Sequence, residues 1–176
     1  MFLVGFMGSG KNTVGRELAR HLGWQFIDLD AEIESREEQS ITEIFRTRGE
    51  VGFRQAETTA VRDFLSNLPG KNSIVALGGG AFAKEENRRL LQGWPTVFLD
   101  APVEELWKRC QQDGVERPLR RNLEQFSSLH GERLPFYRQA SLTVQTSGKR
   151  LLSICSEIEM ALRLGAATKN LEAGES

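Results

Sequence analysis

The sequence has few cysteines, no excess of charge of either sign and no long apolar run. Cys110 and Cys155 are its only cysteines, which leaves no disulfide framework and no Cys-x-x-Cys metal pair, and favours a reducing compartment. Its 23 basic and 24 acidic side chains nearly cancel, so it lacks the basic excess that nonspecific nucleic-acid binding needs. No stretch approaches the roughly 20 apolar residues of a membrane helix. We therefore expect a cytoplasmic protein that binds neither nucleic acid nor membrane.

Short apolar runs alternate with amphipathic stretches along the chain, a pattern typical of β-α-β units around a parallel sheet. Between the second and third runs, residues 30–68 are helical in pattern. Further along the chain, residues 113–128 are polar enough to form a mobile flap. We expect one domain over residues 1–165, followed by a frayed tail at 166–176. The predicted strands are residues 2–4, 24–27, 73–77, 96–99 and 142–144.

The first apolar run leads into a glycine-rich segment. Residues 5–11 read GFMGSGK and fit the GxxxxGK part of the phosphate-binding loop, with a helical pattern after them. Glycines let several backbone N–H groups point at one phosphate chain, the helix N-terminus adds partial positive charge, and Lys11 reaches the β- and γ-phosphates. This motif predicts a nucleotide site formed by Gly8, Ser9, Gly10, Lys11, Asn12 and Thr13.

Asn12 departs from the motif, which places Ser or Thr there to bind Mg²⁺ through a hydroxyl. An amide oxygen is a weaker and differently placed ligand, and Mg²⁺ demands nearly ideal octahedral geometry. Three outcomes are open: Asn12 coordinates the ion through its carbonyl, water takes the place, or catalysis is impaired.

Two aspartates, Asp28 and Asp30, follow the second apolar run. Because the carboxyl ends of parallel strands open onto one crevice, these carboxylates should face the phosphate loop. A carboxylate can orient an alcohol that accepts a phosphoryl group and can take its proton, and a second can hold a water on Mg²⁺. The alternative is that one of them caps the next helix. We predict a catalytic role for at least one.

Six segments in order resemble the shikimate kinase family: GFMGSGK, FIDLD, IFRTRGEVGFRQAE, LGGGA, ERPL and LPFYRQA. Many kinases share the phosphate loop, whereas the combination of DxD, GxxxFR, GGG, RPL and YR patterns is much narrower. The resemblance covers residues 2–162. It implies a five-stranded parallel sheet flanked by helices, like nucleoside monophosphate kinases, with a lid at 113–128 and a helical substrate-binding region at 30–68.

The resemblance also implies the reaction: the protein would transfer the γ-phosphate of ATP to the 3-hydroxyl of shikimate, with Mg²⁺ as the metal ion. It further implies that the protein is a monomer. Asp30 would orient and deprotonate that hydroxyl, and Asp28 would act through Mg²⁺ together with Asn12. Arg54 and Arg138 would pair with the substrate carboxylate, because a planar guanidinium matches both carboxylate oxygens. The alternative for Arg54 is an exposed pair with Glu57, whereas in the resemblance Glu57 holds Arg54 in position. The alternative for Arg138 is a cation near a helix C-terminus.

Further positions take roles from the same resemblance. Lys11 and Arg117, the latter in the lid, would stabilise the phosphoryl group in transfer. Arg109 resembles the residue that stacks on adenine. Gly78, Gly79 and Gly80 would let bare backbone approach the substrate ring.

Two rival functions come from different classes. A gluconate kinase would also need a hydroxyl and a carboxylate site, and only the GGG and YR segments argue against it. A noncatalytic nucleotide-binding relative is supported by Asn12 alone. The joint presence of Lys11, Asp30, Arg54, Arg117 and Arg138 argues against that reading.

Overall fold

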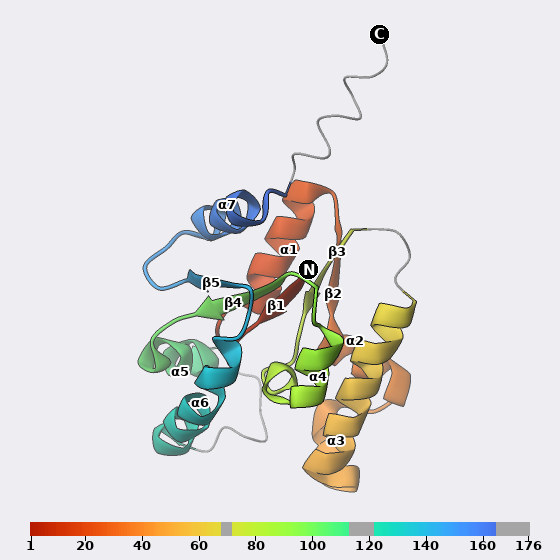
Figure 1. Ribbon diagram of the computed structural model, residues 1–176. Helices are drawn as coiled ribbons and strands as arrows, with labels where there is room; N and C mark the ends of the chain where they lie inside the picture. Colours follow the sequence, from red (N-terminus) through yellow and green to blue (C-terminus); the bar gives the residue numbers. More distant parts are fainter. Residues whose placement is uncertain (68–71, 113–121, 165–176) are drawn as a thin grey trace.

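The structure, a computed structural model, describes residues 1–67, 72–112 and 122–164 (Figure 1). Within them, five strands form one sheet in the order β2-β3-β1-β4-β5, and every neighbouring pair is parallel. The predicted fold class is confirmed, and each predicted strand boundary lies within one residue of the observed one. The strands are β1 (Phe2–Val4), β2 (Gln25–Asp28), β3 (Ser73–Ala76), β4 (Thr96–Asp100) and β5 (Leu142–Gln145).

Helices cover both faces of this sheet (Figure 1). On one face lie α1 (Lys11–Leu22) and α7 (Leu151–Leu162), which pack against each other. The other face is covered by α3 (Ile41–Ser66), η1 (Ala81–Ala83), α4 (Glu85–Leu90), α5 (Val103–Gln112) and α6 (Leu123–Tyr137), with α2 (Leu29–Glu37) against α3. The result is a three-layer arrangement in which the strands are buried.

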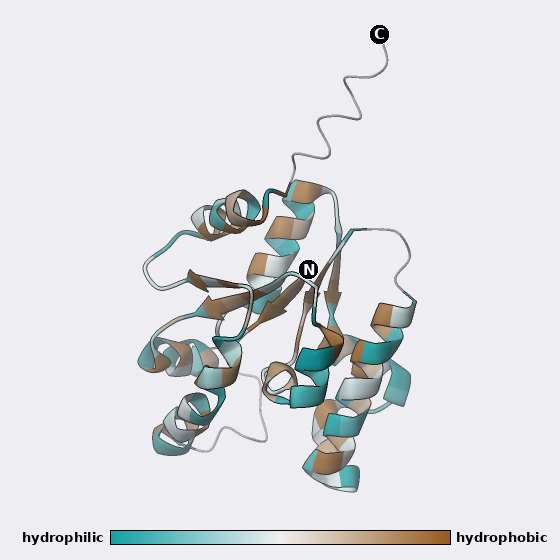
Figure 2. Cartoon of the chain, in the orientation of Figure 1, coloured by the Kyte–Doolittle hydropathy of each residue, from teal (hydrophilic) through white to brown (hydrophobic). Residues whose placement is uncertain are grey.

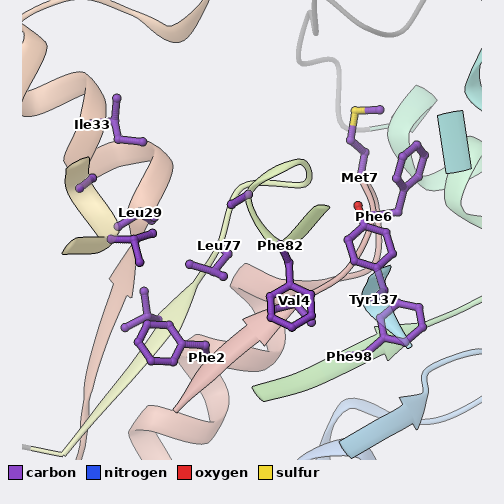
Figure 3. Packing of buried hydrophobic residues seen from close by; sticks show 14 of the residues in the cluster. Phe2, Val4, Phe6, Met7, Leu29, Ile33, Leu77, Phe82, Phe98 and Tyr137 are labelled. Atoms are coloured by element: carbon purple, nitrogen blue, oxygen red, sulfur yellow. The ribbon is translucent and has the colours of Figure 1, made fainter. Parts of the chain in front are cut away.

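The strands divide their side chains between two apolar clusters, because successive residues of a strand point to opposite faces. Phe2 and Val4 belong to the cluster beneath α3 and α6, while Leu3 between them packs with α1 and α7. Apolar residues accordingly concentrate along the strands in Figure 2. In Figure 3 the rings of Phe98 and Tyr137 lie beside each other, stacked with centroids 5.3 Å apart. This contact fixes α6 over β4.

Residues 29–66 form α2 and α3, in agreement with the strand-free helical region predicted at 30–68, whose last residue lies outside the described ones. Gly49 interrupts α3 with a φ of 66°, so the helix bends before it reaches Arg54. Of the predicted lid at 113–128, residues 113–121 lie outside the described part. Residues 123–128 are the first turns of α6, because Asn122 caps that helix by accepting from the Gln125 N–H at 2.8 Å.

The sheet brings three segments of the chain to one edge. β1 lies between β3 and β4, and Asp28 at the end of β2 pairs with Ala76 at the end of β3. The loop after β1, the start of α2 and the three glycines after β3 therefore meet at the carboxyl ends of neighbouring strands, where α/β proteins bind ligands. The predicted tail at 166–176 lies outside the described residues. None of the described helices is long and apolar enough to cross a membrane.

Candidate active site

The phosphate loop, residues 5–10, joins β1 to α1. Gly5, Gly8 and Gly10 have φ angles of 148°, 76° and 87°, values that residues other than glycine rarely adopt. At Gly8 a Cβ atom would also lie 2.7 Å from the Leu106 carbonyl oxygen of α5. Gly10 begins α1 without a side-chain cap, and the first turn of α1 carries no acidic residue. The first N–H groups of α1 are therefore available to an anion.

The Lys11 ammonium lies inside this loop. It donates to the carbonyl oxygens of Gly5 and Phe6 at 2.9 and 3.0 Å, and its Nζ lies 3.5 Å from the Ser9 hydroxyl. A cation so close to the first turn of α1 adds its full charge to the partial charge of the helix end. The loop therefore has the geometry and the charge of a phosphate site.

A cleft of about 430 Å³ extends from the loop across the sheet edge. Asp28 and Asp30 both line it, as predicted from their position after β2. Asp28 is the N-cap of α2, where its Oδ1 accepts from the Asp30 N–H at 3.1 Å. Its other oxygen, Oδ2, accepts from Asn12 Nδ2 at 2.6 Å. The capping role that was the alternative for this aspartate thus coexists with a place in the cleft.

At the other end of the cleft lies Arg109 of α5. Its Nη1 lies 3.3 Å from the Gly8 carbonyl oxygen and 3.5 Å from the Thr146 hydroxyl, while its Nη2 pairs with Glu105. Thr146 and Lys149, in the loop after β5, line the same end. Arg109 thus connects the phosphate loop to the loop after β5.

The three glycines after β3, residues 78–80 and here called the glycine turn, form the centre of a second site. A Cβ atom on Gly78 would lie 2.5 Å from Asp30 Oδ1 and 2.8 Å from Glu57 Oε1. A Cβ atom on Gly80 would collide with the guanidinium group of Arg54. At these two positions the absence of a side chain is what lets charged groups contact the backbone.

Arg54 is held at the glycine turn by Glu57, one turn further along α3. Arg54 Nη1 donates to Glu57 Oε2 at 2.9 Å, and Arg54 also contacts Glu50. The Glu57 side chain is fully buried; burial raises the pKa of its carboxyl group, and the Arg54 guanidinium opposes that rise. The exposed pair considered as the alternative for Arg54 is therefore a buried contact that orients its guanidinium.

Two side chains of α6 meet at the Gly79 carbonyl oxygen. The Tyr137 hydroxyl donates to it, and Arg133 Nη1 donates to it at 3.3 Å. Tyr137 is completely buried, and burial raises its pKa to about 12, so the hydroxyl remains a donor. Arg133 is 8% exposed. Both residues therefore hold the glycine turn from α6.

Arg138 is predicted to join Arg54 at the substrate site, and this role stays a prediction. Arg138 is exposed at the C-terminal end of α6, as its alternative interpretation foresaw, and Arg133 is the α6 arginine that reaches the glycine turn. The physical reason is helical spacing. Arg133 and the buried Tyr137 are four residues apart and share a face, whereas Arg138 is rotated by about 100° from Tyr137. That spacing in RLPFYR was a signal the sequence reading missed.

The structure brings together most of the remaining predicted residues. Gly8, Gly10, Lys11, Asn12, Thr13, Asp28, Asp30, Gly79 and Arg109 line one cleft, with Ser9 buried in the loop beneath it. Arg117, predicted to act from the lid, lies outside the described residues. Of the residues that the structure describes, no group of three or more His, Cys, Asp or Glu side chains could hold a metal by itself.

Comparison with known proteins identifies the family. A family model described as shikimate kinase matches residues 7–163. The shikimate kinase of Persephonella marina is 42% identical over 159 residues, which cover 90% of this chain and 95% of the relative. That of Thermus thermophilus is 44% identical over 161 residues, covering 89% of this chain and 85% of the relative.

Solved structures agree with this assignment. The shikimate kinase from Acinetobacter baumannii in complex with shikimate is 37% identical with a TM-score of 0.84, over 94% of this chain and 93% of that one. The Aquifex aeolicus shikimate kinase is also 37% identical, with a TM-score of 0.79 over 92% and 95%. A gluconokinase from Sinorhizobium meliloti, 20% identical with a TM-score of 0.55, shares the fold alone. On the extent and identity of these matches, the chain belongs to the shikimate kinase family.

Proposed function

We propose that the protein transfers the γ-phosphate of ATP to the 3-hydroxyl of shikimate, a step in the biosynthesis of aromatic amino acids. The observation that carries the proposal is the glycine turn. One carboxylate, Asp30, and two guanidinium groups, Arg54 and Arg133, approach it beside the phosphate loop. A ligand bound there meets a proton acceptor and two anion-binding groups at once, and shikimate carries the matching hydroxyl and carboxylate groups.

In this proposal the acceptor is bound through its carboxylate and activated at its hydroxyl. Arg54 and Arg133 bind the carboxylate, because buried guanidinium groups form the strong charge-assisted hydrogen bonds that a carboxylate accepts. Glu57 keeps the Arg54 guanidinium in place through their 2.9 Å contact. Asp30 orients the 3-hydroxyl and takes its proton as the new O–P bond forms. Arg138, which is exposed at the end of α6, is assigned no contact in this scheme.

The nucleotide is bound in the cleft on the other side of Asp30. The N–H groups of residues 8–13 and the Lys11 ammonium contact the phosphates, and Arg109 lies beside the base. Lys11 stabilises the charge on the phosphoryl group during transfer, and Arg117 is proposed to do so as well, from outside the described residues.

The donors beside the phosphate loop fit a magnesium ion that arrives with ATP. Asp28 offers carboxylate oxygen, a donor of the kind Mg²⁺ prefers, and Asn12 contacts that carboxylate. One or two protein groups suffice where the phosphates supply the other ligands, so the lack of a three-carboxylate cluster among the described residues suits this ion. When bound, Mg²⁺ would neutralise charge on the β- and γ-phosphates.

The described groups of both sites come from one chain, and we propose that the protein acts as a monomer in the cytoplasm. Size-exclusion chromatography with light scattering would give a mass close to the 19.8 kDa of one chain. A dimer at the concentrations used in the assay would contradict this part of the proposal.

The function is tested by measuring ADP production from MgATP with shikimate, gluconate and AMP as separate acceptors. We expect turnover with shikimate alone, and mass spectrometry should identify the product as shikimate 3-phosphate. Turnover with gluconate in place of shikimate would overturn the assignment of the acceptor. A protein that binds ATP and turns over none of the three would be a noncatalytic relative.

A further inference from the structure

Residue 12 is where this chain departs from the phosphate-loop motif, and its contacts in the structure are defined. Asn12 is the second residue of α1 and is exposed at the mouth of the cleft. Its side-chain nitrogen Nδ2 lies 2.6 Å from Asp28 Oδ2. An ionised carboxylate only accepts hydrogen bonds, so the amide NH₂ group, and not the amide carbonyl, must face it. The orientation of the Asn12 amide is thereby settled by chemistry.

A serine and an asparagine offer different things at this position. A serine hydroxyl can donate its hydrogen to a carboxylate while a lone pair of the same oxygen binds a metal ion. In asparagine the donor and the acceptor are separate atoms on a planar amide. With Nδ2 directed at Asp28, the carbonyl oxygen Oδ1 points in another direction. A metal ion next to Asp28 therefore finds no oxygen of residue 12 where the hydroxyl of a serine would be.

Asp28 is held on both of its oxygens. Asn12 donates to Oδ2 from the first turn of α1, and the Asp30 N–H donates to Oδ1 from the first turn of α2. The carboxylate is thus fixed between the helix that follows the phosphate loop and the helix that carries Asp30. Each carboxylate oxygen still has a lone pair for a metal-bound water. Since Mg²⁺ gives up its waters reluctantly, contact through water suits this arrangement.

We propose that Asn12 is a positioning residue for Asp28 and does not coordinate the metal ion. Water fills the coordination place that a serine hydroxyl would take, so the nucleotide complex binds Mg²⁺ more weakly than it would with serine at residue 12. This inference rests on the proposed function only in that the nucleotide brings a magnesium ion to the cleft. It requires no particular phosphoryl acceptor.

The test measures metal binding directly, without an acceptor. Mn²⁺ would be titrated into the purified protein saturated with ADP, with free Mn²⁺ followed by electron paramagnetic resonance and Mg²⁺ added as competitor. We expect Asn12→Ser to bind Mn²⁺ about fivefold more tightly than the unchanged protein, because a direct oxygen ligand replaces water. Asn12→Ala should bind it roughly tenfold more weakly, because Asp28 loses a donor that orients it. Equal or weaker binding by Asn12→Ser would overturn the proposal.

A second measurement uses the unchanged protein, so it does not depend on how the variants fold. The side-chain NH₂ resonances of Asn12, assigned by triple-resonance spectroscopy of the unchanged protein, would be followed as Mg²⁺ is added to the ADP complex. They should stay close to their initial positions while Asn12 remains bonded to Asp28. A large shift that saturates with Mg²⁺ would mean that the amide oxygen coordinates the ion, and would also overturn the proposal.

The matched control is Asn67→Ser, the same exchange at an exposed residue after α3 whose amide donates to the Asp63 carbonyl oxygen. It should bind Mn²⁺ as the unchanged protein does. The outcomes are separable from those for the proposed function. If the unchanged protein does not turn over shikimate while the Asn12 variants shift the affinity for Mn²⁺ as expected, shikimate is refuted as the acceptor and the role of Asn12 is retained.

Discussion

The phosphate loop and the proposed acceptor site share one edge of the sheet, yet they are built in different ways. The loop and the start of α1 are one continuous segment, residues 5–13, and its shape follows from local conformation at three glycines with positive φ. The proposed acceptor site takes its groups from four separate segments: Asp30 of α2, Arg54 and Glu57 of α3, the glycine turn, and Arg133 and Tyr137 of α6. A local motif can be read from sequence, whereas an assembled pocket depends on how helices pack.

The largest effect is expected at the residue that faces both sites. Asp30→Asn should leave ATP affinity near normal and lower kcat by about 10²–10⁴-fold, because the amide cannot accept the proton of the hydroxyl. Steady-state kinetics with shikimate and an ATP-binding titration would measure the two quantities. Full activity in this variant would remove Asp30 from the mechanism.

The next comparison separates the two arginines of α6. Arg133→Leu should raise the KM for shikimate roughly 10- to 100-fold, the cost of losing hydrogen bonds to a charged group. Arg138→Leu, on the exposed end of the same helix, should change it less than about twofold.

Because Arg133 is buried, its variant must be shown to fold by circular dichroism and thermal unfolding. A larger loss of shikimate binding in Arg138→Leu than in Arg133→Leu would assign the substrate carboxylate to Arg138, as the resemblance to the family predicts.

The glycine turn allows substrate binding and catalysis to be separated. In Gly80→Ala the new Cβ atom displaces the Arg54 guanidinium, so we expect a rise of about tenfold in the KM for shikimate with kcat little changed. In Gly78→Ala it displaces the Asp30 carboxylate, so kcat should fall instead.

Gly131→Ala is the control for this pair, because a Cβ atom at that position of α6 meets open space and should leave both constants unchanged. The same pattern of kcat and KM changes in Gly78→Ala and Gly80→Ala would refute the separate roles.

The smallest effect concerns the packing against the phosphate loop. The ring of His130 on α6 contacts that of Phe6, with centroids 5.2 Å apart, and burial lowers the pKa of His130 below its usual value of 6.5. The unfolded chain therefore binds a proton near pH 6.5 that the folded protein does not bind. The free energy of unfolding should fall as the pH drops below about 6.5, and be unaffected by this group above it.

Urea unfolding across this pH range would measure the effect. In His130→Gln, the free energy of unfolding should change less steeply with pH. An unchanged slope in the variant would assign the pH dependence to other groups.

Several parts of the site could be predicted from the residues around them. The phosphate loop was found because its glycines, Lys11 and the flanking strand are adjacent in sequence, and Asp28 and Asp30 because the carboxyl ends of parallel strands share a crevice. The contact of Arg133 with the glycine turn was not predicted, for lack of that adjacency. Arg133 and Arg138 both lie near the YR pair, and only the burial of Tyr137 shows which face of the helix is turned to the glycine turn. The flap predicted at 113–128 was subject to the same limit: residues 123–128 are polar, and only the structure shows that they begin α6.

By itself, the sequence determined the parallel α/β fold, the position of its strands, the phosphate loop and the resemblance to one kinase family, because each depends on short-range pattern or on residues close in the chain. Tertiary structure alone decided that Arg133 reaches the Gly79 carbonyl oxygen, that Glu57 is buried behind Arg54, and that Asn12 donates to Asp28. These contacts join residues on different helices or assign a side chain to one face of a helix. Packing against the sheet fixes such choices, and sequence spacing leaves them open.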